Sequence, residues 1–382
     1  MLTRPLRLLV LCIAMVTLGA CSSTGGSVPE PTQLQSIVAQ QELVKHWSSK
    51  VGAGDHNAFS VLEPVLQQDQ IVAVASSGIV AAYQLDTGAA VWQVDLAQTV
   101  SAGIGEAQGL LFVATQNGKL LALSDVDGSL QWQANTSSEA LAVPQANEQL
   151  VVVQTIDGKV SAYQLEDGKF LWSYAANLPS LTVRGTSTPV VTKNYTYAGF
   201  ASGKLVALDN QTGSIVWQQT VGSAKGRSEI ERLVDIDGAL QLLDGVLYST
   251  SYQGSLVAID ALTGAVKWQQ PLSSLSSVLI VGNTILAVDA DDVVLAYDRM
   301  DGHVLWHNDS LKYRLLSSAM SLGNEALVVD AQGYAHLLQL TDGAFLGRKK
   351  IGTLGARVGS KSYQNNIYIL SQDGRLTRIG LK

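Results

Sequence analysis

The stretch Gly118-Lys119-Leu120-Leu121-Ala122-Leu123-Ser124-Asp125-Val126-Asp127-Gly128-Ser129-Leu130-Gln131-Trp132 sets a pattern that recurs along the chain. It contains a glycine, a second glycine ten residues later and a tryptophan four residues after that. The same spacing occurs at Gly78, Gly88 and Trp92; at Gly158, Gly168 and Trp172; at Gly203, Gly213 and Trp217; and at Gly254, Gly264 and Trp268. Three further copies are incomplete: Asp292 replaces the first glycine of the copy that ends at Trp306, Gly347 replaces a tryptophan, and the copy that starts at Gly374 has no tryptophan after it.

Each copy has the pattern of a β-hairpin. An apolar, partly alternating run such as residues 120–123 indicates a strand. A turn such as Glu166-Asp167-Gly168 follows, where glycine supplies the positive φ without a Cβ clash. The tryptophan ends a second short strand, and we expect its large ring to pack between one repeat and the next.

The tryptophans from Trp47 to Trp306 are 38 to 51 residues apart, which is the size of a four-stranded propeller blade. Seven repeats and a truncated eighth predict an all-β fold, an eight-bladed β-propeller of four-stranded antiparallel blades. We expect residues 43–47 to supply the strand that is missing after Ile379. The N-terminal strand then closes the ring and leaves no long exposed edge, whereas an open solenoid would need polar capping repeats.

Residues 1–20 are typical of a lipoprotein signal peptide. Arg4 and Arg7 precede an apolar run, residues 8–18, that is too short to span a bilayer. Small residues then lead to Cys21, which resembles the lipidated cysteine of a bacterial lipobox; an ordinary secretory signal with a chance cysteine is the alternative. The resemblance implies a lipid on Cys21 and, because serine follows, sorting to the outer membrane. We expect residues 21–39 to form a flexible lipid-anchored tether and residues 40–382 to form the propeller.

Composition and motifs argue against most catalytic and binding chemistry. The only cysteines are Cys12 and Cys21, so the mature fold has no disulfide, thiol nucleophile or thiolate metal site. Removing Arg4 and Arg7 with the signal leaves 23 basic and 32 acidic residues, a net charge of −9, without the clustered Lys and Arg that a nucleic acid requires. The histidines lack a zinc-binding spacing, and neither a phosphate loop nor a serine nucleophile elbow occurs. We therefore predict no enzyme, no cofactor and no metal.

Two insertions break the repeat spacing in successive repeats. They are residues 178–185, Leu-Pro-Ser-Leu-Thr-Val-Arg-Gly, and residues 228–238, Ser-Glu-Ile-Glu-Arg-Leu-Val-Asp-Ile-Asp-Gly. Extra residues in a repeat fold form loops on one face, which is often the binding face, and we expect these two loops to be neighbours. Apolar residues ringed by charges of both signs suit a protein-binding patch, while an internal Arg–Asp pair that ties the loops together is the alternative. The candidate partner-binding residues are Leu181, Val183, Arg184, Asp235 and Asp237.

The lipobox, the propeller repeats and the two loops together resemble the BamB family, the lipoprotein subunits of the β-barrel assembly machinery of the bacterial outer membrane. The family's Leu-x-Leu-Arg motif matches at Leu181, Val183 and Arg184, with valine in place of the second leucine, and its paired acids match at Asp235 and Asp237. In the family these residues dock on the periplasmic POTRA domains of BamA, the barrel subunit. The resemblance therefore implies a non-enzymatic, periplasm-facing scaffold that helps BamA fold and insert outer membrane proteins. Unfolded outer membrane proteins are a further candidate partner, through strand addition at a blade edge.

Two other functions stay open at this point. Residues 258–268 also resemble the tryptophan-docking motif of pyrroloquinoline-quinone dehydrogenases, which are eight-bladed propellers too. The cofactor site of that family uses an adjacent cysteine disulfide and a calcium ion, and the mature chain lacks such a cysteine pair, so the motif implies the fold and not the activity. A propeller that binds an envelope polymer in its central channel is the other alternative.

Overall fold

The computed structural model describes residues 29–54, 61–183, 186–222, 227–352 and 359–382. The chain divides into two compact units, residues 1–31 and residues 32–382. Only residues 29–31 of the first unit are described, so the predicted signal peptide and Cys21 lie outside the described residues. Within the described ranges, no helix combines the length and the hydrophobicity needed to cross a membrane.

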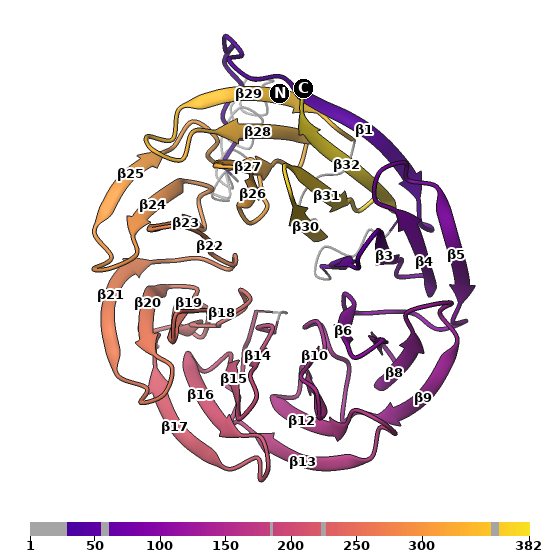
Figure 1. The fold of residues 1–382 in the computed structure, drawn as a ribbon. Helices are drawn as coiled ribbons and strands as arrows, with labels where there is room; N and C mark the ends of the chain where they lie inside the picture. The colour runs from indigo at the N-terminus through magenta and orange to yellow at the C-terminus, as the bar shows by residue number, and fades with distance from the viewer. Residues whose placement is uncertain (1–28, 55–60, 184–185, 223–226, 353–358) are drawn as a thin grey trace, which may run out of the picture. The chain divides into compact units, whose positions relative to one another are not determined.

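The described part of residues 32–382 forms eight four-stranded antiparallel sheets, which follow one another around a ring (Figure 1). The predicted eight-bladed β-propeller is therefore confirmed. Blades 1 to 7 each use four consecutive strands, from β2–β5 to β26–β29, whereas blade 8 has the order β1-β32-β31-β30. The only helix in the described ranges is the short 3-10 helix η1 (Ile230–Arg232).

The strands occupy four positions in each blade, and at each position they are numbered from blade 1 to blade 8. The innermost strands are β2 (Val65–Leu66), β6 (Gly105–Ala107), β10 (Gln145–Ala146), β14 (Val190–Val191), β18 (Gln241–Leu243), β22 (Leu279–Val281), β26 (Met320–Leu322) and β30 (Gly359–Tyr363). The second strands are β3 (Gln70–Val74), β7 (Leu110–Thr115), β11 (Leu150–Gln154), β15 (Tyr195–Gly199), β19 (Val246–Thr250), β23 (Thr284–Val288), β27 (Glu325–Val329) and β31 (Asn366–Leu370). The third strands are β4 (Ile79–Gln84), β8 (Lys119–Ser124), β12 (Lys159–Gln164), β16 (Lys204–Asp209), β20 (Gly254–Asp260), β24 (Val294–Asp298), β28 (Tyr334–Leu338) and β32 (Arg375–Leu381). The outer strands are β5 (Ala90–Asp95), β9 (Leu130–Asn135), β13 (Phe170–Ala175), β17 (Ile215–Thr220), β21 (Val266–Leu272), β25 (Val304–Asn308), β29 (Phe345–Lys350) and β1 (Leu43–Lys50).

The hydrophobic core lies between neighbouring blades. Val72 and Val74 of β3, for example, pack in one cluster with Leu111 and Val113 of β7. The second and third strands are covered on both faces by the adjacent blades, which explains why they read as continuous apolar runs in the sequence. Burial of these side chains supplies the main stabilising free energy of the ring.

Each docking tryptophan packs on the turn glycine of the next blade. If Gly168 carried a Cβ atom, this atom would lie 2.4 Å from the ring of Trp132, whose Nε1 donates to the Leu165 carbonyl at 3.0 Å. Gly168 also has a φ of 71°, so both its conformation and this contact require glycine. The same contact joins Trp47 to Gly88, Trp92 to Gly128, Trp172 to Gly213, Trp217 to Gly264, Trp268 to Gly302 and Trp306 to Gly343. The expectation that these rings pack between repeats is confirmed.

The ring is closed by the N-terminal strand, as the truncated last repeat predicts. β1 pairs antiparallel with β32, and Trp47 lies opposite Arg378 while Ser49 lies opposite Leu376. Trp47 then bridges to blade 1, because its Nε1 donates to the Leu85 carbonyl at 2.9 Å. The two ends of the propeller therefore share one sheet, which lies at the upper right of Figure 1.

Residues 32–42, which we call the strap, run along the outer strand of blade 7 before β1 begins. The backbone N–H groups of Gln40 and Gln41 both donate to the Leu346 carbonyl, at 2.8 and 3.0 Å. Arg348 Nη1 donates to the Gln35 carbonyl at 2.7 Å. The compact unit therefore begins at residue 32, ahead of residue 40, the expected first residue of the propeller.

The strap explains the one full-length repeat that lacks its tryptophan. If Gly347 carried a Cβ atom, this atom would lie 2.5 Å from the Gln41 carbonyl oxygen, so the strap occupies the space that a side chain would need. A tryptophan would also have no turn to dock on, because the third and outer strands of blade 8 come from opposite ends of the chain.

Candidate docking surface formed by two loops

The two insertions form connections at neighbouring blade junctions. Loop A (residues 176–189) joins β13 of blade 3 to β14 of blade 4, and loop B (residues 221–240) joins β17 of blade 4 to β18 of blade 5. Arg184 in loop A and residues 223–226 in loop B lie outside the described residues. Because both loops join an outer strand to the next innermost strand, both lie on the same face of the propeller.

A carboxylate of loop B holds the backbone of loop A. The Val183 N–H donates to Oδ2 of Asp235 at 2.5 Å, and the Asp235 side chain is fully buried. Burial raises the pKa of Asp235 to about 6, because removal from water disfavours the charged carboxylate, and the N–H of Val183 opposes this rise only in part. The structure thus brings the two predicted loops together, through a backbone donor and an aspartate.

Loop B is itself fixed between blades 4 and 5. Val234 and Ile236, on either side of Asp235, are buried. The Ile236 side chain lies so close to Gly199 of β15 that a Cβ there would come within 2.5 Å of it. The Tyr252 N–H donates to the Asp235 carbonyl at 2.9 Å. These contacts make residues 234–236 a rigid support for loop A.

Apolar side chains are exposed on both loops. Leu178 and Leu181 of loop A are 37% and 42% exposed, and Ile230 of loop B is 66% exposed. Apolar side chains surrounded by polar ones are typical of a protein-docking patch. Leu178 and Ile230 belong to the inserted sequences but are not among the predicted partner-binding residues. The sequence signal that could have identified them is an apolar residue inside a polar insertion.

Ile230 is presented on a turn that caps itself. The Glu231 carboxylate accepts the backbone N–H groups of Arg227 and Ser228 at 2.6 and 3.2 Å. The Glu231 N–H donates in return to the Ser228 hydroxyl at 3.3 Å, which is the reciprocal pattern of a capping box. These donors lower the pKa of Glu231, since they stabilise its charged form. The Ser-x-x-Glu sequence therefore holds η1 and its exposed isoleucine in place.

The five predicted partner-binding residues differ in how exposed they are. Leu181 is exposed, Val183 is partly buried and Asp235 is fully buried. Asp237 is partly buried and makes a further noncovalent interaction. Arg184 lies outside the described residues, as does the predicted lipidation site, Cys21.

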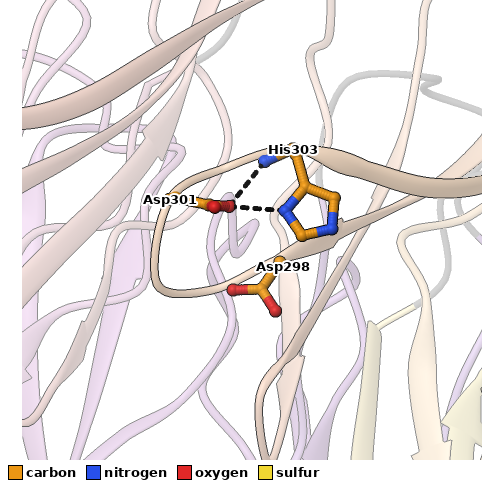
Figure 2. A group of neighbouring side chains, drawn as sticks. All are labelled: Asp298, Asp301 and His303. Atoms are coloured by element: carbon orange, nitrogen blue, oxygen red, sulfur yellow. Dashed lines mark hydrogen bonds and ion pairs between the residues drawn. The ribbon is translucent and has the colours of Figure 1, made fainter.

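A group of possible metal ligands lies in the turn between β24 and β25, where Asp298, Asp301 and His303 meet (Figure 2). Asp301 Oδ1 accepts the His303 N–H at 3.0 Å and lies 2.6 Å from His303 Nδ1, which raises the pKa of this histidine. Asp298 accepts the Met300 N–H at 2.7 Å and the Asn283 side-chain amide at 2.8 Å. The carboxylates thus cap their own turn, and we assign them a structural role.

Comparison with known proteins places the whole propeller in one family. A family model described as outer membrane protein assembly factor BamB matches residues 76–308 and 242–380. The chain is 42% identical to outer membrane protein assembly factor BamB of Pseudomonas aeruginosa, over 96% of each chain. It is 32% identical to the protein of the same name in Escherichia coli, over 96% of this chain and 97% of that one.

Solved structures agree with this assignment. The crystal structure of BamB from Moraxella catarrhalis superimposes with a TM-score of 0.80 at 30% identity, and the match covers 89% of this chain and 100% of that chain. A quinohemoprotein alcohol dehydrogenase from Comamonas testosteroni superimposes with a TM-score of 0.68 at 13% identity, over 89% of this chain and 76% of that chain. The second likeness concerns the propeller fold alone. The chain belongs to the BamB family of outer membrane protein assembly factors.

Proposed function

We propose that the chain is a non-enzymatic scaffold lipoprotein of the outer membrane β-barrel assembly complex. The observation that carries this proposal is full-length similarity to assembly factors, with 96% of the chain matched to the Pseudomonas aeruginosa protein. In the proposal, the chain docks on the periplasmic POTRA domains of BamA and so assists the folding and insertion of outer membrane proteins. Its own contribution is a rigid ring that presents two loops to this partner.

Loops A and B form the proposed docking surface. Leu181 and Ile230 supply apolar contacts, and Val183 extends the surface along loop A. The proposal also assigns Arg184 and Asp237 to partner binding. Asp235 does not itself face the partner, because its side chain is buried. Its carboxylate accepts the Val183 N–H and so fixes the backbone of loop A. Pre-organisation of this kind favours a small interface, because less conformational entropy is lost on binding.

The proposed membrane attachment is a lipid on Cys21, with the predicted tether of residues 21–39, whose residues 32–39 belong to the strap. Hydrogen bonds hold Thr32, the first residue of the strap, against the propeller. The Thr32 N–H donates to the Lys312 carbonyl at 3.0 Å, and Arg314 Nη1 donates to the Thr32 carbonyl at 2.8 Å. Lys312 and Arg314 belong to the connection between β25 and β26, which lies on the same face as loops A and B. Confinement of both partners to one membrane raises their effective concentration, so a weak interface suffices.

Co-purification with BamA tests the proposal. The double variant Leu181→Ala with Arg184→Glu should lose most of the co-purified BamA and keep the thermal unfolding midpoint of the parent. Retention of BamA at the parent level would mean that the docking surface lies elsewhere. Labelling with a radioactive fatty acid should succeed in the parent and fail in Cys21→Ser, and a dehydrogenase assay with added quinone and calcium should show no activity.

A further inference from the structure

Every outer strand contains a β-bulge at the same place. In each blade the ladder between the third and outer strands skips one residue of the outer strand. In blades 1 to 7 this residue follows the turn glycine by three positions and directly precedes the tryptophan position. The bulge residues of blades 1 to 8 are Val91, Gln131, Leu171, Val216, Lys267, Leu305, Leu346 and His46.

The bulge of blade 7 is covered by the chain's own strap. The Leu346 carbonyl accepts the N–H groups of Gln40 and Gln41. The Leu346 side chain is only 4% exposed and belongs to the same cluster as Leu43, where the strap enters β1. Blade 7 therefore shows what fits such a bulge, namely a polypeptide segment that bends at Gln40 and Gln41, donates two consecutive backbone N–H groups to one carbonyl and continues into an apolar side chain.

Equivalent bulges carry exposed apolar residues on blades 1, 3, 4 and 6, and among these blades only 3 and 4 are adjacent. Leu171 of blade 3 and Val216 of blade 4 are each 44% exposed. The residue before each of them, Phe170 or Ile215, is also apolar and exposed, as is Val304 before Leu305 of blade 6. Two large apolar side chains in sequence on an exposed outer strand are unusual, because natural sheets protect such edges with polar residues. Blades 2 and 5 follow that rule, with Gln131 and Lys267 at the bulge.

We propose that the neighbouring bulges of blades 3 and 4 bind an apolar segment of another polypeptide, held as the strap is held on blade 7. The segment would donate backbone N–H groups to the bulge carbonyl, and one of its apolar side chains would cover Leu171 or Val216. A bulge interrupts regular strand pairing, so the contact is local and does not extend the sheet. This proposal does not depend on the docking of BamA, which uses loops A and B.

The strap itself supplies the probe. A synthetic peptide with the sequence of residues 33–43, Gln-Leu-Gln-Ser-Ile-Val-Ala-Gln-Gln-Glu-Leu, is added to the purified full chain, which carries a photo-crosslinking amino acid at position 171, 216, 131 or 267. We expect crosslinks at positions 171 and 216 to exceed those at 131 and 267 by at least about fivefold, as one additional buried apolar side chain provides. A control peptide with serine at its four Leu, Ile and Val positions should give no excess.

Two variants make the test specific. Leu171→Gln and Val216→Lys introduce the residues that blades 2 and 5 carry at the same position, so the fold should tolerate them. In the double variant, peptide binding measured by fluorescence anisotropy should weaken about tenfold. Equal crosslinking at all four positions, or unchanged binding by the double variant, would overturn the proposal. Crosslinked dimers that form at 171 or 216 without peptide would also overturn it, because the occupant would then be a second copy of the chain.

Discussion

The Trp47 ring lies against Gly88, and this contact joins the last blade of the propeller to the first. Trp47 belongs to the N-terminal strand β1, and Gly88 to the turn before β5. The same tryptophan–glycine contact connects the interior blades, so the closing junction is built like most of the others. Closure therefore needs no special device beyond the placement of β1 beside β32.

The tryptophan hydrogen bond at this junction should contribute measurably to stability. Trp47→Phe keeps much of the ring packing and removes the bond to the Leu85 carbonyl, so it should cost about 1 kcal/mol more than Trp92→Phe. Trp92 is the matched control because its Nε1 has no hydrogen-bond partner among the described residues. Urea unfolding of both variants measures the difference. Equal loss at both positions would show that the indole hydrogen bond contributes nothing at closure.

Asp235 should make the stability of the chain depend on pH. Its folded pKa of about 6 lies above the ordinary value of 3.8, so the folded state binds the proton more tightly than the unfolded state. The stabilising contribution is complete below about pH 4 and is lost as pH rises through 6, and it amounts to about 3 kcal/mol.

Asp235→Asn tests this dependence directly. The amide oxygen still accepts the Val183 N–H, while the charge that burial disfavours is gone. The variant should unfold at a higher temperature than the parent at pH 8, and the difference should shrink towards pH 4. Thermal unfolding curves across this range check the result, and a constant difference at all pH values would contradict it. Asp235→Ala, which also removes the acceptor, should be less stable than Asp235→Asn throughout.

Arg314 should be important for both the fold and the strap. It is buried, its Nε donates to Asp330 Oδ2 at 2.8 Å, and Asp330 is fully buried as well. Arg314→Ala leaves this carboxylate without its guanidinium partner, so it should destabilise the chain by about 3 kcal/mol. It also removes the donor to the Thr32 carbonyl, so amide hydrogen exchange should become faster at Thr32 and Gln40.

The exposed ion pair between Lys382 and Glu42 provides the control for Arg314. Because exposed pairs contribute little, Lys382→Ala should leave the unfolding midpoint unchanged within error. If Arg314→Ala behaves like Lys382→Ala, the buried pair does not hold the strap.

The exposed isoleucine of η1 should matter for partner binding and not for folding. Ile230→Asp places a charge in the proposed docking surface, so it should weaken binding to the BamA POTRA domains about tenfold or more. Leu262→Asp is the matched control, because Leu262 is equally exposed but lies in the turn between β20 and β21, on the opposite face. Equal loss of binding in both variants, or in neither, would contradict the proposed surface.

The sequence by itself determined the architecture, because each repeat specifies the same turn and the same pair of strands, and successive repeats must pack against one another. Glycine at positions such as Gly168 fixes a turn with positive φ, and the tryptophan four residues later needs a neighbouring blade to bury its ring. The last repeat has no tryptophan after Gly374, while Trp47 lies ahead of the first repeat. Together these two features predict that the N-terminal strand completes the last blade. The short innermost strands escaped prediction, since two to five residues carry too little periodicity.

Only the tertiary structure decided what the irregular residues do. The adjacency of loops A and B followed from their order in the chain. The burial of Asp235 beside Val183, in contrast, depends on the packing of Val234 and Ile236 between blades 4 and 5. The only sequence signal for the strap was Gly347 at a position where other repeats have tryptophan. The Gln41 carbonyl of the strap occupies the space that a side chain at this position would need. Local residue patterns specify turns and strands, whereas burial and long-range contacts arise only when distant segments occupy the same volume.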